Sequence, residues 1–386
     1  MSNFDDLYAY VEERDLRDRN FKNNIRSLYL KNAKWIFPFN DVLSSIFFFW
    51  LRPAKKKKYF FLGTRFKHLI SALPVEEVCI IGGPKQLLYC LRNNIHYIPN
   101  GVFWKLLSKG FIVNNFSKIK QTAYKQSKLL GKIRHDTQQA LMIVENDSLP
   151  IQRLYCNIAA ESNIKTVCIQ HGLFQSKTDP KTIDGWKCDY FICYDDKQKE
   201  VLSGLGIDRH KVMIGGFYEP IIQVKTYSKN PPLKVCFLGQ PWFKYGDVYK
   251  NKYQHIVNVL STSLREPESH FYFKPHPWEK DAEYLKNMSN VFMGSMQEAI
   301  ESYDVFFSFT STALLEVTMA GKVAIQIYDD LFACDNFETL GYAYSVKSDE
   351  LKENIPALLR HTPYPLELPS FDHLVNQIKL LTKVIL

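Results

Sequence analysis

The chain has 386 residues, 46% of them hydrophobic and 23% charged, so it is long enough for two globular domains and too apolar to be disordered. Its formal net charge of +9 admits a nucleic acid, an anionic lipid or a polyanionic substrate as a partner. The sequence contains no zinc-finger spacing, RNP signature or basic helix with base-reading residues. We therefore expect no nucleic-acid partner.

The cysteine pattern indicates whether the protein works in a reducing or an oxidising compartment. The eight cysteines are scattered, form no CxxC pair and lie mostly inside apolar runs, which is typical of buried thiols rather than of a zinc site or a disulfide framework. Residues 1–18 are polar and acidic and do not resemble a signal peptide. We expect a cytoplasmic protein without a bound metal or cofactor.

The first 58 residues are predicted to form a peripheral helical and basic segment. Residues 1–34 are charged, and 35–51 carry a dense group of aromatic side chains that is too short and interrupted to span a bilayer. A basic cluster follows, made of Lys55, Lys56, Lys57 and Lys58. This combination suits peripheral binding to the anionic inner face of the cytoplasmic membrane. The alternative is that the aromatic side chains pack in a core and the lysines form a solvated turn.

From Tyr59 onward, short apolar runs alternate with helical spacing, which predicts mostly parallel sheets. The run 78–81 ends in Gly82-Gly83-Pro84, a strand, glycine turn and helix that lacks the full GxGxxG spacing. Residues 101–137 read as helical and basic, which suits either an anionic acceptor polysaccharide or a solvated helix face.

Two successive strands are predicted at 141–144 and 166–169, and each ends in polar residues. Because right-handed crossovers bring the carboxyl ends of parallel strands to one edge, these residues should lie together. His171 follows the second strand and is suited to a general base, since its unperturbed pKa lies near neutrality. Asp147 or Glu145 could orient His171 or act as the base instead.

The second half contains a hydroxyl-rich turn and a histidine-containing loop. The strand 233–238 ends at Gly239 and Gln240, and the strand 271–273 ends in the loop KPHP. A third strand, 305–309, stops at a hydroxyl cluster that precedes a helix, where free N–H groups attract phosphate. The alternative is that these hydroxyls are ordinary helix caps. Glu316 lies early in that helix, where it could accept hydrogen bonds from a ribose or be a surface charge.

Three segments in this order, TVCIQHG, KPHP and DVFFSFTSTALLEVTMAGKVAI, resemble the GT-B glycosyltransferases of bacterial surface polysaccharides. Members of that group include polysialyltransferases, capsule Kdo transferases and teichoic-acid polymerases that use CDP-glycerol. The resemblance covers roughly residues 140–330 and implies that the HP and Ser/Thr motifs hold the phosphate of a CMP- or CDP-linked donor. The donor-binding residues expected on this basis are Gly239, Gln240, Lys274, His276, Pro277, Thr310, Ser311, Thr312 and Glu316.

One part of the family pattern is missing. Several CMP-sugar enzymes carry an acidic-acidic-Gly signature that supplies the base, and the nearest approach here is Ile183-Asp184-Gly185. The sequence therefore leaves the base open among His171, Asp147 and Glu145.

We predict an α/β protein with a GT-B-like fold, in which two Rossmann-like domains with parallel sheets face a central cleft. The predicted parts are an acceptor domain at 1–216, a linker at 217–232, a nucleotide-donor domain at 233–370, and a C-terminal helix at 371–386 that packs back across the junction. No Asp-x-Asp stands in a convincing loop, which favours a metal-independent mechanism.

The predicted function is transfer of a sugar or polyol phosphate from a nucleotide-activated donor to a glycan or glycolipid acceptor in capsule, lipopolysaccharide or teichoic-acid synthesis. One alternative is a sugar-nucleotide epimerase or hydrolase of the same architecture. Another is a non-catalytic partner of a capsule assembly complex that binds glycan or membrane.

Overall fold

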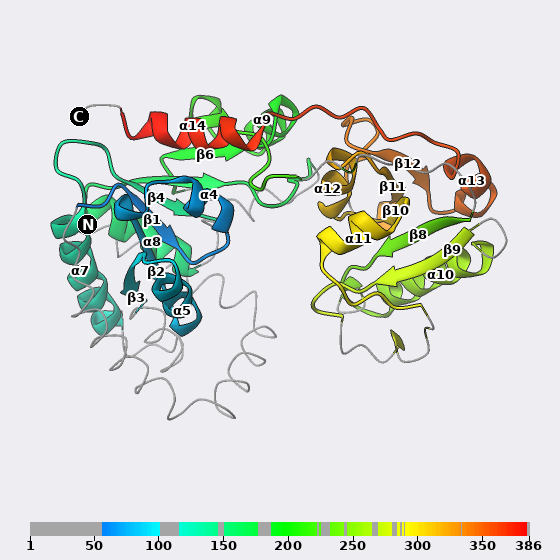
Figure 1. The fold of residues 1–386 in the computed structure, drawn as a ribbon, viewed down its shortest axis with the longest axis horizontal. Coiled ribbons are helices and arrows are strands. Elements are labelled where there is room, and N and C mark those ends of the chain that lie inside the picture. Colours follow the sequence, from blue (N-terminus) through cyan, green and yellow to red (C-terminus); the bar gives the residue numbers. More distant parts are fainter. Residues whose placement is uncertain are drawn as a thin grey trace. The chain divides into compact units, whose positions relative to one another are not determined.

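The computed structural model describes residues 56–100, 116–145, 150–176, 187–221, 224, 232–242, 245–264, 269–279, 284–285, 288, 290–332 and 334–383. The described residues divide into two compact units, which are coloured along the chain in Figure 1. The first unit draws on the ranges 1–171, 179–220 and 369–386, and the second on 172–178 and 221–368.

The first unit contains a seven-stranded sheet in the order β3-β2-β1-β4-β5-β6-β7, and every neighbouring pair is parallel. Its strands are β1 (Tyr59–Leu62), β2 (Val78–Gly82), β3 (His96–Pro99), β4 (Leu141–Val144), β5 (Lys165–Ile169), β6 (Tyr190–Cys193) and β7 (Val212–Ile214). The central strands are apolar on both faces, as expected for a parallel sheet covered by helices on both sides.

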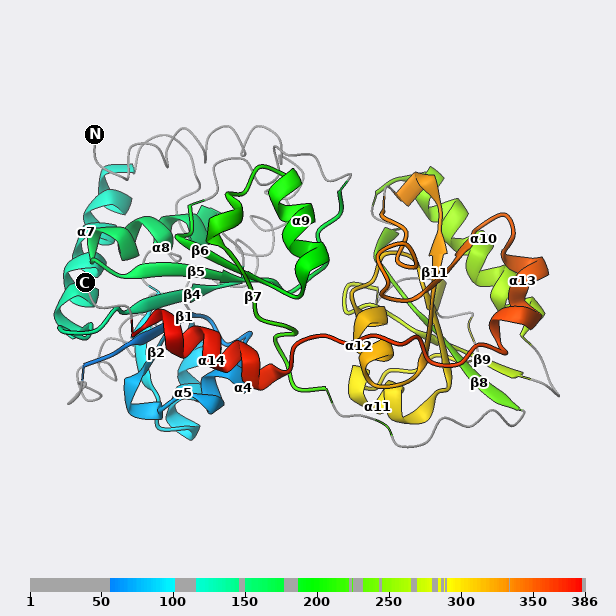
Figure 2. The same ribbon diagram turned by 90° about the horizontal axis from the view of Figure 1, so that it is seen from above.

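Helices cover both faces of this sheet. Figure 2 shows α4, α5 and α14 on one side of it and α7, α8 and α9 on the other. Their bounds are α4 (Lys67–Ala72), α5 (Pro84–Arg92), α7 (Phe116–Ile133), α8 (Pro150–Glu161), α9 (Asp196–Gly204) and α14 (Phe371–Leu381), with short 3₁₀ turns at Val75–Glu77 and Arg209–Lys211. The alternation of strand and helix thus produces a doubly wound layer structure.

The C-terminal helix α14 belongs to the first unit. Ser370 caps its start by accepting a hydrogen bond from the backbone N–H of His373, and Leu374, Val375, Ile378 and Leu381 are buried. The His373 ring reaches the carbonyl of Ile214 at 3.2 Å, and Thr382 lies 3.4 Å from the Tyr59 hydroxyl. These contacts tie the end of the chain to strands β7 and β1.

The second unit contains a five-stranded parallel sheet in the order β12-β11-β10-β8-β9. Its strands are β8 (Leu233–Leu238), β9 (Ser269–Lys274), β10 (Val305–Ser308), β11 (Val323–Tyr328) and β12 (Tyr344–Lys347). Its helices are α10 (Asp247–Ser263), α11 (Met296–Ser302), α12 (Ala313–Met319) and α13 (Leu351–Leu358), with a 3₁₀ turn at Asp330–Phe332.

Alternation along the strands builds the core of this unit. In β9, buried residues alternate with partly exposed ones, so Phe271 and Phe273 point into the core while Tyr272 and Lys274 point to the opposite face. The phenylalanines join a cluster that is completed by α10 and α13. The prediction of two α/β units with parallel sheets is therefore confirmed.

Candidate functional site

The order of strands in the second unit defines a switch point between β8 and β10. From β8 the chain crosses to β9 on one side of the sheet, and from β10 it crosses to β11 on the other. In open α/β sheets, ligands bind outside the carboxyl ends of the strands at such a point. The predicted residues Gly239, Gln240 and Thr310 follow the ends of these two strands.

Gln240 joins the two strand ends through paired hydrogen bonds. Its side-chain amide donates to Thr310 Oγ1 at 2.8 Å, and its side-chain carbonyl accepts from the Thr310 backbone N–H at 2.8 Å. Ser308 Oγ donates to the carbonyl of Leu238 at 2.8 Å. The loops that begin at these strand ends are thus held in register by side chains.

The loop after β9 holds His276 in one tautomer. The backbone N–H of Trp278 donates to Nδ1 of His276 at 3.2 Å. Because Nδ1 accepts, the neutral ring carries its proton on Nε2, which becomes a hydrogen-bond donor. Pro277, the residue after His276, lacks a backbone N–H and restricts φ, so it helps to keep the loop out of helical geometry.

Lys274 is engaged on the opposite face of the sheet from the core. Its ammonium donates to the carbonyl of Gly294 at 2.6 Å and lies 5.7 Å from the centre of the Phe292 ring. An ammonium has three N–H groups, so the bond to Gly294 does not by itself exclude a second bond from Lys274 to a phosphate.

The hydroxyl cluster before α12 makes local contacts. Ser311 Oγ accepts from the backbone N–H of Ala313 at 3.2 Å, which is a short capping turn. Thr312 makes no capping bond, and its Oγ1 accepts from the backbone N–H of Leu173 at 3.0 Å. Glu316 is half-buried in the first turns of α12.

The hydrogen bond from Leu173 to Thr312 is one of several contacts that residues 172–176 make with the rest of the second unit. Residues 172–176 follow β5 in the chain but group with the second unit. The backbone N–H and hydroxyl of Ser176 both donate to the Asp335 carboxylate, and the Asp335 N–H donates to Gln175 Oε1 at 2.8 Å. Sequence reasoning missed Asp335, and no local pattern marks a partner 159 residues away.

The first unit has its own switch point, between β1 and β4. A hollow of about 550 Å³ lies there. Arg65 follows β1, Glu145 follows β4, and their side chains form an ion pair with a distance of 3.4 Å between Nε and Oε2. The polar lining of the hollow includes Thr64, Arg65, Lys67, His68, Gln86, Glu145 and Glu219. Apart from Glu145, these residues were not predicted, although Gly63-Thr64-Arg65 directly after an apolar run is a signal that could have been used.

His171 follows β5 and is half-buried. It lies close enough to Arg65 and Glu145 for their charges to change its pKa. Burial lowers the pKa of its imidazole, and the Arg65 guanidinium lowers it further. The Glu145 carboxylate and a hydrogen bond to the Glu145 backbone act in the opposite direction on the same pKa. The structure thus brings together two of the three predicted catalytic residues, and it keeps His171 neutral near pH 7.

Several predicted residues lie outside the described part of the chain. These are Asp147, Lys55 and the segment Ile183-Asp184-Gly185. The other three members of the basic cluster precede β1. Lys57 is buried and donates to the Glu76 carbonyl at 2.6 Å, and Lys58 pairs with Glu77 at 2.6 Å. Lys56 is half-exposed and pairs with Asp136 at 3.3 Å.

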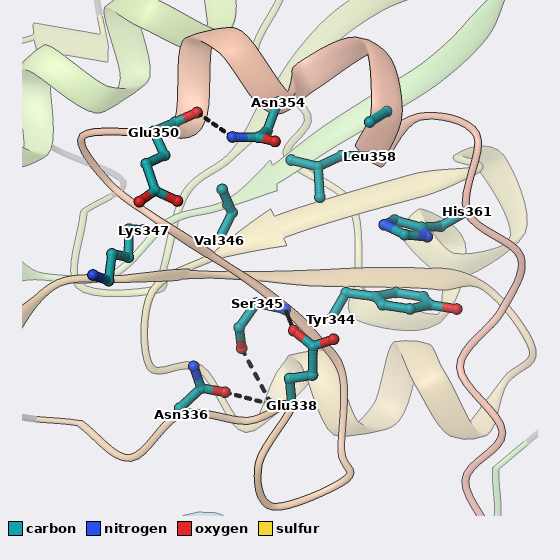
Figure 3. A pocket seen from close by; sticks show the side chains of 11 residues that line it. Asn336, Glu338, Tyr344, Ser345, Val346, Lys347, Glu350, Asn354, Leu358 and His361 are labelled. Carbon is teal, nitrogen blue, oxygen red and sulfur yellow. Dashed lines mark hydrogen bonds between the residues drawn. The ribbon is translucent and has the colours of Figure 1, made fainter.

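A second cavity, of about 290 Å³, lies along the outer edge strand β12. Figure 3 shows the rings of Tyr344 and His361 at one end, stacked with 3.9 Å between centroids, and Lys347 and Glu350 at the other. Glu338 accepts a hydrogen bond from the backbone N–H of Ser345 at 3.1 Å. Two strands separate β12 from the switch point, so this cavity is distinct from the predicted donor residues.

Comparison with known proteins identifies the fold. No protein-family model matches the chain, and no curated protein sequence is significantly similar to it. Its structure is similar to that of Alr3699/HepE from Anabaena in complex with UDP and glucose, with a TM-score of 0.51 and 12% identity over 85% of this chain and 96% of that protein. It is also similar to the UDP-GlcNAc 2-epimerase from Methanocaldococcus jannaschii, with a TM-score of 0.55 and 12% identity over 84% and 98% of the two chains.

At these identities the likeness establishes the fold alone. The chain has a GT-B-like fold of two α/β domains with parallel sheets, as the sequence predicted.

Proposed function

We propose that the protein is a glycosyltransferase that moves a sugar or polyol phosphate from a nucleotide-activated donor to a cell-surface glycan. The observation that supports it most directly is the donor-type constellation at the switch point of the second unit. Gln240 and Thr310 fix the two strand ends there, and the neighbouring His276 loop offers an Nε2–H donor. Preorganised donors of this kind stabilise the charge that develops on a departing phosphate.

In this proposal, the second unit binds the donor. His276 donates to the phosphate, the hydroxyls of Ser311 and Thr312 provide further contacts, and Glu316 accepts from the ribose. The Thr312 oxygen accepts from the Leu173 N–H, so its own hydroxyl proton can be donated to the phosphate while that bond is kept. Donor binding therefore does not require the segment 172–176 to move.

The first unit provides the acceptor side of the proposed reaction. The hollow at its switch point contains both cationic and anionic side chains, which suits a polar glycan. His171, with a lowered pKa, is neutral and able to accept the proton of an acceptor hydroxyl as that oxygen attacks the donor. Glu145 and Asp147 are the alternatives for this role.

A nucleotide panel tests the donor assignment. The resemblance in the sequence points to a CMP- or CDP-linked donor, whereas the two similar structures carry names that refer to UDP or UDP-GlcNAc. We expect calorimetry on the full chain to detect CMP, CDP or UDP and to show weaker binding of GDP. If none of the four nucleotides binds, the donor site has been misassigned.

A second candidate function is epimerisation of a nucleotide sugar, favoured by the structural similarity to the UDP-GlcNAc 2-epimerase. The two reactions differ in their requirement for an acceptor. Transfer consumes donor only when a glycan hydroxyl is present, whereas an epimerase converts the nucleotide sugar alone. Conversion of a nucleotide sugar without acceptor would therefore favour the epimerase, and nucleotide binding without turnover in either assay would favour a non-catalytic partner of an assembly complex.

We also propose peripheral membrane binding through the basic residues that precede β1. Within the described residues, no helix is long and apolar enough to cross a bilayer. Lys57 and Lys58 are largely covered, whereas Lys56 stays exposed although it pairs with Asp136, so attraction to lipid would depend on Lys55 and Lys56. We expect the double substitution of Lys55 and Lys56 by glutamine to reduce co-sedimentation with anionic vesicles at low salt. Binding that is absent in the parent protein, or that persists at high salt, would contradict this proposal.

A further inference from the structure

Glu279 is a carboxylate with no solvent exposure, three residues beyond His276 in the loop after β9. Fully buried carboxylates are rare unless their oxygens are paired or hydrogen-bonded, because loss of hydration is costly. A buried carboxylate beside the proposed donor site therefore calls for a physical explanation.

The carboxylate acts as an acceptor for three neighbouring groups. The backbone N–H of His276 donates to Oε2 at 2.7 Å, and the hydroxyls of Tyr253 and Tyr284 donate to Oε1. The Tyr253 oxygen accepts from the Gln240 backbone N–H at 3.1 Å, so its own proton is directed to Glu279. Burial and then the charge of Glu279 raise the pKa of both tyrosines, which keeps them protonated as donors.

These bonds form a connected hydrogen-bond network between separate elements of the second unit. Glu279 connects the His276 loop after β9 to Tyr253 in α10, and Tyr253 connects to Gln240 after β8. Gln240 then reaches Thr310 after β10. The hydrogen-bond network therefore connects all three strand ends that carry the proposed donor residues.

Gly239 allows the carboxylate to sit this close to the end of β8. A Cβ at this position would lie 2.3 Å from Glu279 Oε2 and 2.9 Å from the Phe273 ring. The Gly239 N–H also donates to the carbonyl of Lys274 at 2.8 Å. The loops after β8 and β9 are thus packed against each other around the carboxylate.

The same turn sets the orientation of the His276 ring. The Glu279 N–H donates to the His276 carbonyl at 2.8 Å, while the Trp278 N–H donates to His276 Nδ1 at 3.2 Å. The Glu279 carboxylate therefore fixes the His276 backbone N–H, and the turn that it closes carries the Trp278 N–H that sets the ring tautomer.

We propose, on the basis of the function proposed above, that Glu279 is a positioning residue for the nucleotide donor. It fixes the His276 and Gln240 loops before the donor arrives, so that binding does not have to order them. Glu279 itself does not touch the donor in this proposal. Its effect reaches the donor through His276 and Gln240.

Three substitutions in the full-length chain test whether this hydrogen-bond network positions the donor residues. Glu279→Gln keeps the shape but replaces one acceptor oxygen by a donor, which leaves at least one of the three groups unsatisfied. Whichever of CMP, CDP, UDP and GDP binds the parent most tightly should bind this variant roughly tenfold more weakly. Tyr253→Phe removes the connection to Gln240 and should have a smaller effect. Tyr284→Phe removes a hydroxyl that contacts Glu279 and Tyr253, and leaves the Tyr253 bonds to Glu279 and Gln240 in place, so it should have the smallest effect.

A spectroscopic measurement separates positioning from general stability. The ¹⁵N NMR signals of the His276 ring should show the Nε2-protonated tautomer in the parent and a shift toward a mixture in Glu279→Gln. This measurement does not require nucleotide. If the parent binds none of the nucleotides but the ring signals change, the proposed function fails while the positioning role stands.

Two matched controls complete the test. Glu298→Gln alters an exposed carboxylate that caps α11 in the same unit, and Tyr155→Phe removes a buried hydroxyl bonded to Asn100 and Gln126 in the other unit. Neither should change nucleotide affinity or the His276 signals. Parent-like affinity and ring signals in Glu279→Gln would overturn the proposal, as would affinity losses that simply follow the melting temperature across all five variants. If Glu279→Gln does not fold, Tyr253→Phe compared with Tyr155→Phe decides the same question.

Discussion

His171→Ala is expected to lower turnover roughly 100- to 10,000-fold, the range typical for loss of a positioned general base. The ring belongs to the first unit, beside Glu145 and Arg65, whereas the proposed donor residues belong to the second. The substitution should therefore leave nucleotide affinity nearly unchanged, because it removes an interaction needed for proton transfer and not for ground-state binding. Steady-state kinetics and calorimetry on the same preparation would measure both quantities.

The pH dependence of the reaction gives an independent test of this role. A general base must be unprotonated, and the pKa of His171 is lowered below its ordinary value of 6.5. The acid limb of the kcat/KM profile should therefore lie below pH 6.5. Arg65→Gln removes a positive charge that lowers this pKa and should shift the limb to higher pH, whereas Glu145→Gln removes a negative charge that raises it and should shift the limb lower.

Substitution of the two carboxylates decides between the remaining candidates. Glu145→Gln and Asp147→Asn should retain much more activity than His171→Ala if the histidine is the base. Near-normal turnover in His171→Ala together with an inactive carboxamide variant would assign the base to that carboxylate and leave His171 as a neighbour.

Most strands could be predicted because apolar runs of four to six residues end abruptly in glycine or polar residues. The runs at β4, β5, β8 and β10 follow this pattern, and the structure places each within one or two residues of the predicted bounds. Strands β3, β11 and β12 were not predicted. The sequences of β3 and β12, HYIP and YSVK, contain polar residues or proline, since each of these two strands lies at the edge of a sheet and has only one neighbour.

The sequence predicted which residues of the candidate site follow strand ends, but not which residues far apart in the chain contact each other. Motifs that follow strand ends could be placed at the proper edge of a parallel sheet, which is why Gln240 and Thr310 were both selected. Pairings such as Leu173 with Thr312, or Ser176 with Asp335, depend on how distant segments pack, and no periodicity encodes that. The direction of Lys274 could have been inferred, since it alternates with the core residue Phe273 along β9.

His276→Ala is expected to weaken nucleotide binding roughly tenfold, because it removes a hydrogen-bond donor aimed at a charged phosphate. The double variant of Ser311 and Thr312 to alanine should weaken it by a similar factor. Both effects should appear in the dissociation constant measured by calorimetry, with a circular dichroism spectrum that matches the parent.

Conservative substitutions make this last prediction specific to the proposed geometry. Glutamine can place an amide N–H near the position of the His276 Nε2 proton, so His276→Gln should retain more affinity than His276→Ala. His276→Asn is a shorter amide that corresponds better to Nδ1 and should behave like alanine. Thr312→Ser keeps the hydroxyl that accepts from Leu173 and should bind nucleotide like the parent protein. Equal affinity in the parent, His276→Ala and the double alanine variant would show that the nucleotide binds elsewhere, and equal losses in His276→Gln and His276→Ala would show that the Nε2 proton is not the group that matters.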